Sequence, residues 1–112
     1  MTGGGAGEAS SGGTVLELHG AAMRSMSDLH EQVAGHPATP DTYARDFDAL
    51  FDVLVAHYRP PIHIRWYDAP LAKKRMGRDF PRAVAVIEDA AGFHRTKGKV
   101  FELELIEGPA PA

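Results

Sequence analysis

The sequence predicts an α/β fold, a two-layer structure in which about four helices pack on one face of a three-stranded parallel sheet. The length of 112 residues is sufficient for one domain. Three strand-like segments alternate with helical segments, and helical crossovers of this kind join parallel strands. Each strand alternates apolar and polar residues, so we expect helices on one face of the sheet and water on the other.

The strands are predicted from their two-residue period. They cover residues 14–19 (TVLELH), 62–66 (IHIRW) and 100–106 (VFELELI). The alternation predicts which of their side chains point into the core, namely Leu16, Leu18, Ile62, Ile64, Trp66, Phe101, Leu103 and Leu105.

The strongest helical pattern covers residues 46–58 (DFDALFDVLVAHY). At about 100° per residue, its apolar side chains form one stripe, made by Phe47, Leu50, Phe51, Leu54 and Tyr58. Asp46 is the expected N-cap, and Asp48 adds a favourable negative charge in the first turn. The two prolines that follow end this helix.

Three further helices are predicted from residues that cap or end a helix. Each begins after a short polar side chain and ends at a glycine. The expected pairs are Ser25 or Ser27 with Gly35, Asp68 with Gly77, and Asp79 with Gly92.

The two ends of the chain differ from the domain between them. Residues 1–13 are predicted to be a flexible Gly/Ser-rich tail and residues 108–112 a frayed end, which leaves residues 14–107 as the domain. The sequence has no cysteine, no signal-peptide pattern, and no apolar run near the ~18–20 residues that cross a bilayer. We therefore expect a cytoplasmic protein that makes no membrane contact.

Six histidines raise the question of a metal site. His30 and His36 are six residues apart, whereas zinc ligands on one helix face are about four apart, and Gly35 interrupts the helix between them. No phosphate-binding glycine motif and no nucleophile motif is present. We therefore expect no metal, no cofactor and no catalytic nucleophile.

The net charge of −3 conceals an uneven distribution. Residues 1–58 carry eight acidic and two basic residues, whereas residues 59–112 carry seven acidic and ten basic residues. The second half includes a basic stretch with two interpretations, a phosphate-binding surface and, more simply, a solvated surface. We define this basic stretch as Lys73, Lys74, Arg75, Arg78 and Arg82.

Asp48 and Asp52 are the most informative acidic residues. Their spacing of four places both carboxylates on one helix face, beside the apolar stripe. No lysine or arginine stands three or four residues from Asp52. Three interpretations remain open: an acid/base pair for hydrolysis, an anionic face that docks on a cationic protein site, and a solvated acidic surface.

Three stretches resemble the barstar family, the intracellular inhibitors of secreted guanyl-preferring ribonucleases. Residues 43–52 (YARDFDALFD) resemble its second-helix signature of Tyr followed by Asn-Leu-Asp-Ala-Leu-aromatic-Asp. Residues 26–30 (MSDLH) resemble the start of its first helix, and residues 61–66 (PIHIRW) resemble its second strand. The resemblance covers about residues 14–107 and implies the same parallel sheet with helices on one face.

The resemblance also implies a function. Members of this family form 1:1 complexes with a ribonuclease and block its active site with an acidic helix, whose carboxylates replace RNA phosphates. The resemblance therefore implies a protein that is not an enzyme, and we expect it to bind no nucleic acid. By position, the implied ribonuclease-binding residues are Asp52 as the main anchor, Asp48 as the second contact, and Phe51, Thr42, Tyr43, Ala56, His57 and Asp89 around them.

Two alternatives to a ribonuclease inhibitor stay open. The first is a barstar-like interaction module for another toxin or a regulatory protein, because a fold does not determine a partner. Less favoured is an RNA-binding domain that uses the basic stretch.

Overall fold

The computed structural model describes residues 13–111. The predicted N-terminal tail therefore lies outside the described residues except for Gly13, and the division into tail, domain and frayed end stays a prediction. Along the chain, the elements are β1 (Thr14–His19), a 3₁₀ turn η1 (Gly20–Ala22), α2 (Met26–Ala34), α3 (Phe47–Asp52), a π-helical turn η2 (Val53–His57), β2 (Ile62–Tyr67), α4 (Ala69–Met76), α5 (Asp79–Arg95) and β3 (Phe101–Leu105).

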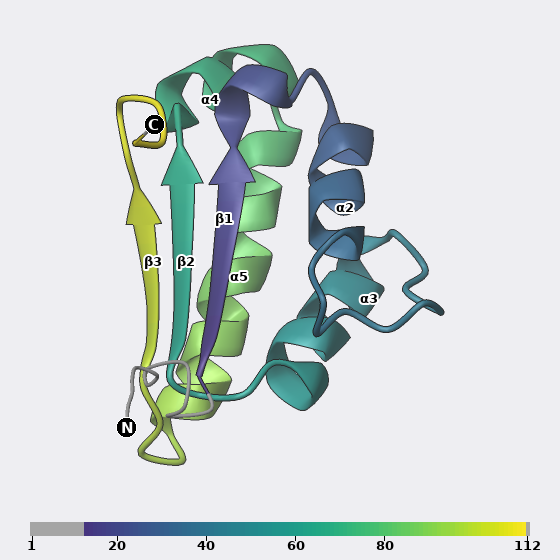
Figure 1. Cartoon of the computed structure of the whole chain (residues 1–112), viewed down its shortest axis with the longest axis vertical. Coiled ribbons are helices and arrows are strands. Elements are labelled where there is room, and N and C mark those ends of the chain that lie inside the picture. Colours follow the sequence, from purple (N-terminus) through teal and green to yellow (C-terminus); the bar gives the residue numbers. More distant parts are fainter. Residues whose placement is uncertain (1–12, 112) are drawn as a thin grey trace, which may run out of the picture.

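The three strands form one parallel sheet in the order β1-β2-β3, which confirms the predicted fold class. Leu16 lies beside Ile64, and Ile64 lies beside Leu103, so the core-facing residues of the strands are in register. Figure 1 shows α2, α3 and α5 on one side of the sheet and α4 at the end to which the strands point. Among residues 13–111, no helix lies over the other face of the sheet.

The core lies between the sheet and this helix layer. From the sheet it receives the predicted residues Leu16, Leu18, Ile62, Ile64, Trp66 and Phe101, none more than 3% exposed. The helices contribute the rest, chiefly Leu29, Val33, Leu50, Leu54, Ala83, Ile87, Ala90 and Ala91. The aromatic rings of Trp66 and Phe80 pack with their centroids 4.9 Å apart. Burial of these side chains supplies the main stabilisation of the fold.

The last strand departs from the prediction. Phe101 is buried and Leu103 is half-buried, but Leu105 is 48% exposed although its position in the alternation predicts a core residue. Alternation determines only which face a side chain points to. Because β3 is an edge strand, the helix layer covers its beginning and leaves its end open.

The helix ends also differ from the predictions. Asp68 precedes α4 in a left-handed conformation with φ of 50°, and its side chain makes no capping hydrogen bond. Asp79 is the first residue of α5 instead of its cap, and the side chain of Ser25 makes no hydrogen bond at the start of α2. Gly92 does not end α5, which continues to Arg95. Gly costs only about 1 kcal/mol inside a helix, and packing of the last turn outweighs this.

Candidate functional site

The start of α3 is determined by a local hydrogen bond. The carboxylate of Asp46 accepts a hydrogen bond of 2.7 Å from the backbone N–H of Ala49, so Asp46 is the predicted N-cap. Asp48 follows in the first turn, where a negative charge interacts favourably with the helix dipole. These two residues stabilise the beginning of the helix, and Phe47 and Leu50 pack against the core beside them.

The end of the predicted helix 46–58 is not α-helical. The α-helix stops at Asp52, and residues 53–57 form the π-helical turn η2, closed by a 2.9 Å bond from the N–H of Tyr58 to the carbonyl of Val53. The wider turn brings Nε2 of His57 within 3.6 Å of Oδ2 of Asp52. A period of 3.6 residues contains no signal for this widening, so the sequence analysis missed it.

The outer surface of α3 and η2 carries most of the predicted binding residues. We call this surface the acidic face and define it as Asp48, Phe51, Asp52, Ala56 and His57. Phe51 is half-buried and packs against the core, while the other four residues are exposed. Among the described residues, no lysine or arginine nitrogen lies within 4.0 Å of either carboxylate.

The loop before α3 is tied to the interior by two hydroxyl groups. The Tyr43 hydroxyl bonds to Nδ1 of the buried His30, and the Tyr58 hydroxyl lies 2.8 Å from Oγ1 of Thr39. Tyr43 is only 5% exposed, so its ring has little surface for a partner, whereas the neighbouring Thr42 is exposed. Tyr43 thus positions the loop, a role distinct from the direct contact that the resemblance implies.

The pair of His30 and Tyr43 is neutral at neutral pH. Burial lowers the pKa of His30, and the negative charge of Asp46 offsets this effect only in part. Burial likewise raises the pKa of the Tyr43 hydroxyl.

Nearby, Arg45 has a left-handed φ of 59°, and its guanidinium donates a 2.7 Å hydrogen bond to Glu31. The arginine that precedes the acidic face in sequence is therefore already paired.

The last helix supports η2 from behind. His94 is 5% exposed, and its Nε2 lies 2.8 Å from the carbonyl oxygen of Leu54 inside η2. Its ring stacks on Phe101 with the centroids 5.8 Å apart. A carbonyl in a π-helical turn thereby gains a partner from a residue 40 positions away.

Asp89 lies on α5 and is separate from the acidic face in sequence. Residues 82, 86 and 89 share one face of this helix, because they are spaced by four and three. Arg82 places its guanidinium carbon 5.1 Å from the centre of the Phe47 ring, so that face of α5 adjoins α3. Asp89 is exposed and lies on the same face of α5 as Arg82, and its part in the site stays a prediction.

The basic stretch is divided among structural contacts. Arg75 donates a 2.9 Å hydrogen bond to the carbonyl of Ala21, and Arg82 lies 3.6 Å from the carboxylate of Asp79 as well as over Phe47. The five residues lie on α4, the turn at Gly77 and the first turn of α5. Only some of their charge therefore faces solvent without a partner.

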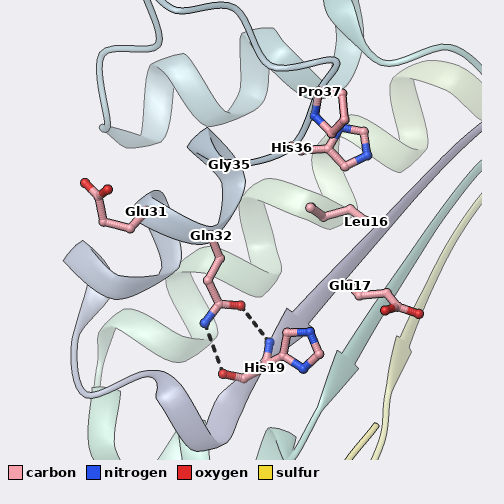
Figure 2. Close-up of a pocket in the computed structure, with 8 residues that line it drawn as sticks. All are labelled: Leu16, Glu17, His19, Glu31, Gln32, Gly35, His36 and Pro37. Carbon is pink, nitrogen blue, oxygen red and sulfur yellow. Dashed lines mark hydrogen bonds between the residues drawn. The ribbon is translucent and has the colours of Figure 1, made fainter. Parts of the chain in front are cut away.

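A shallow pocket between β1 and α2 contains a further set of hydrogen bonds. Figure 2 shows the side-chain amide of Gln32 bridging both backbone groups of His19, at 2.7 Å to its N–H and 3.1 Å to its carbonyl. His36 lies 2.9 Å from the carbonyl of Val15 on the same strand. These side chains occupy part of the free edge of β1, as is common at sheet edges that do not pair.

Sequence reasoning missed the residues that hold the site from inside, chiefly His30, Thr39 and His94. The only signal for them was a polar residue in a buried helix face or a loop, which does not identify its partner.

In residues 13–111, no group of three histidine, cysteine, aspartate or glutamate side chains is arranged to hold a metal. Within the same range, no helix is both long and apolar enough to span a bilayer.

A family model identifies the relatives of this chain. The model, described as barstar, the barnase inhibitor, matches residues 13–106, which include every strand and helix described above. This match extends over most of the chain, whereas the resemblance described above depends on three short motifs. This family consists of proteins that inhibit ribonucleases, and it is not a family of enzymes. The chain belongs to the barstar family.

Proposed function

We propose that this protein is a stoichiometric inhibitor of a small secreted guanyl-preferring ribonuclease and binds it 1:1 through the acidic face. The observation that carries the proposal is Asp52. Its side chain is 67% exposed and has only His57 as an ion-pair contact among the described residues. It stands in a chain that matches the barnase-inhibitor family.

The proposed mechanism is mimicry of RNA. A ribonuclease binds the phosphates of its substrate with cationic side chains, and a carboxylate offers them the same charge and acceptor oxygens. Asp52 is the main anchor and Asp48, one turn earlier, is the second contact. Phe51, Ala56 and Thr42 surround the anchor and exclude water from it, and Asp89 adds a peripheral charge.

Internal contacts hold the acidic face in place before binding, which lowers the entropic cost of association. The Asp46 cap holds one end of α3, and His94 holds η2. The Thr39–Tyr58 and His30–Tyr43 hydrogen bonds hold the loop beside it. Because these contacts are internal, the carboxylates need little rearrangement to meet a cationic site.

The proposal includes a place of action, the cytoplasm. The chain has no cysteine, so it needs no oxidising compartment to fold. An inhibitor of this kind acts by contact alone, without a cofactor or metal.

The decisive experiment is a titration of the protein into a panel of small guanyl-preferring ribonucleases, with residual RNA cleavage as the readout. We expect cleavage by at least one enzyme to fall linearly to zero at one equivalent, and a guanosine mononucleotide to compete. If no enzyme of the panel is inhibited, the proposal is wrong. Formation of a complex in which RNA cleavage continues would also overturn it, in favour of an interaction module for another partner.

A further inference from the structure

We propose that His57 makes binding through Asp52 depend on pH. When protonated, His57 pairs with the Asp52 carboxylate and competes with the cationic groups of the ribonuclease, so binding weakens in acid. The inference rests on the proposed function, because it concerns the same anchor.

The first support is geometry that only η2 produces. In an α-helix, residues five apart point about 140° away from each other, because each residue turns the helix by about 100°. The π-helical turn contains more residues per turn and returns the fifth residue towards the first. Nε2 of His57 accordingly lies 3.6 Å from Oδ2 of Asp52.

The second support is that both side chains remain accessible. The side chain of His57 is 42% exposed and that of Asp52 is 67% exposed, so the contact lies on the surface offered to a partner. Histidine is the side chain that ordinarily changes charge between pH 5 and 8. A protonated His57 therefore adds a positive charge beside the anchor, facing a cationic active site.

The charged groups around His57 identify Asp52 as its partner. On α3, the carboxylates are Asp48 and Asp52, and Arg59 follows η2 in sequence. On α5, which packs behind η2, Glu88 pairs with Arg95 and His94 bonds to the carbonyl of Leu54, while Asp89 is exposed. Among the described residues, Asp52 supplies the only carboxylate within 4.0 Å of His57.

The direction of the effect follows from linkage. The complex disfavours the protonated form of His57, so association in acid must release its proton. Release of one proton raises Kd by at most about tenfold for each unit of pH decrease. Where His57 is already neutral, its contribution does not vary with pH.

The test compares the wild type with His57→Gln against one inhibited ribonuclease, between pH 5 and 8 at constant ionic strength. Titration of the enzyme's own groups changes the Kd of both proteins by the same factor, so it cancels in the ratio of the two Kd values. We expect this ratio to be constant above about pH 7.5 and to rise about fivefold or more towards pH 5. A ratio that stays constant over the whole range would overturn the inference.

His63 provides the matched control. Its Nδ1 lies 3.4 Å from Oε1 of Glu102, its side chain is 38% exposed, and it points to the outer face of the sheet. His63→Gln removes a similar histidine from a similar pair away from the acidic face. The Kd ratio of wild type to His63→Gln should not change with pH, and a change equal to that of His57→Gln would overturn the inference.

The same measurements separate this inference from the proposed function. If Asp52→Ala abolishes inhibition while the ratio for His57→Gln stays flat, only the inference fails. If Asp52→Ala leaves inhibition unchanged, the proposed function fails as well.

Discussion

The acidic face and the basic stretch both look like charge clusters in the sequence, but the structure supports them differently. The acidic face stands on a capped helix and a turn fixed from behind by His94. Its two carboxylates have no lysine or arginine partner within 4.0 Å in residues 13–111. The basic stretch is distributed over two helices and a turn, and Arg75 and Arg82 already bind other parts of the chain.

This difference shows how a functional charge can be separated from a structural one. A charge that binds its own chain has already exchanged water for a protein partner, and it has less to gain from a second protein. A charge held in place but left without an oppositely charged lysine or arginine keeps its full interaction for a partner. The four predictions below concern two questions. One is whether the carboxylates of the acidic face are available to a partner, and the other is whether the charges of the basic stretch serve the protein's own structure.

The largest effect is expected for Asp52→Ala. Loss of the anchor carboxylate leaves cationic groups of the ribonuclease desolvated and unpaired, which costs at least about 2 kcal/mol, or about 30-fold in Kd. Kd from titration of RNA cleavage measures this. Glu102→Ala removes the same charge from the outer face of the sheet and should change Kd by less than about twofold. Equal effects of the two variants on Kd would show that the acidic face contributes to binding only through the net charge of the protein.

The next effect concerns the support of the acidic face. Asp46→Ala removes the cap of α3 and should lower the free energy of unfolding by about 1 kcal/mol. Urea denaturation followed by circular dichroism measures it. Asp41→Ala removes an exposed aspartate from the loop before α3 and serves as the control, with an expected change below about 0.5 kcal/mol. Equal losses from both variants would argue against a specific capping role.

The third prediction concerns pH and the buried His30. Its pKa is lowered in the folded protein, so the unfolded chain binds more protons below pH 6.5. His30 therefore stabilises the fold above that pH, and the contribution is lost as pH falls through the lowered pKa, at no more than about 1.4 kcal/mol per pH unit. Denaturation from pH 4.5 to 7.5 should show a shallower pH dependence for His30→Gln than for wild type. A parallel profile of the two proteins would contradict this assignment.

The smallest effect is expected in the basic stretch. A variant with Lys73, Lys74 and Arg78 replaced by alanine keeps the contacts of Arg75 and Arg82, and it should inhibit the ribonuclease within about twofold of wild type. A mobility-shift titration with single-stranded RNA at low salt should show no binding by the wild-type protein. RNA binding that this triple variant removes would instead favour the alternative of an RNA-binding domain.

Local pattern was enough to predict the fold class and the core side of two strands. The period of two in β1 and β2 gives Leu16, Leu18, Ile62, Ile64 and Trp66 as buried residues, and all five are buried. The cap at Asp46 was equally predictable, because the carboxylate and its donor Ala49 are three residues apart. The spacing of Asp48 and Asp52 likewise placed both carboxylates on one surface.

The remaining features depend on groups that are distant in sequence. η2 is held by His94, 40 residues from Leu54, and the loop is held by a hydrogen bond between His30 and Tyr43. Leu105 is exposed because the helix layer does not reach the end of β3, although its alternation matches that of a core residue.

The sequence by itself therefore determined the type and order of the elements and the charge of the acidic face, since these follow from residues a few positions apart. Only the tertiary structure decided that Asp52, the proposed anchor, has His57 beside it and that Tyr43 turns inward. The physical reason is that hydrogen bonds and packing between distant segments outweigh local helix preferences of about 1 kcal/mol per residue or less.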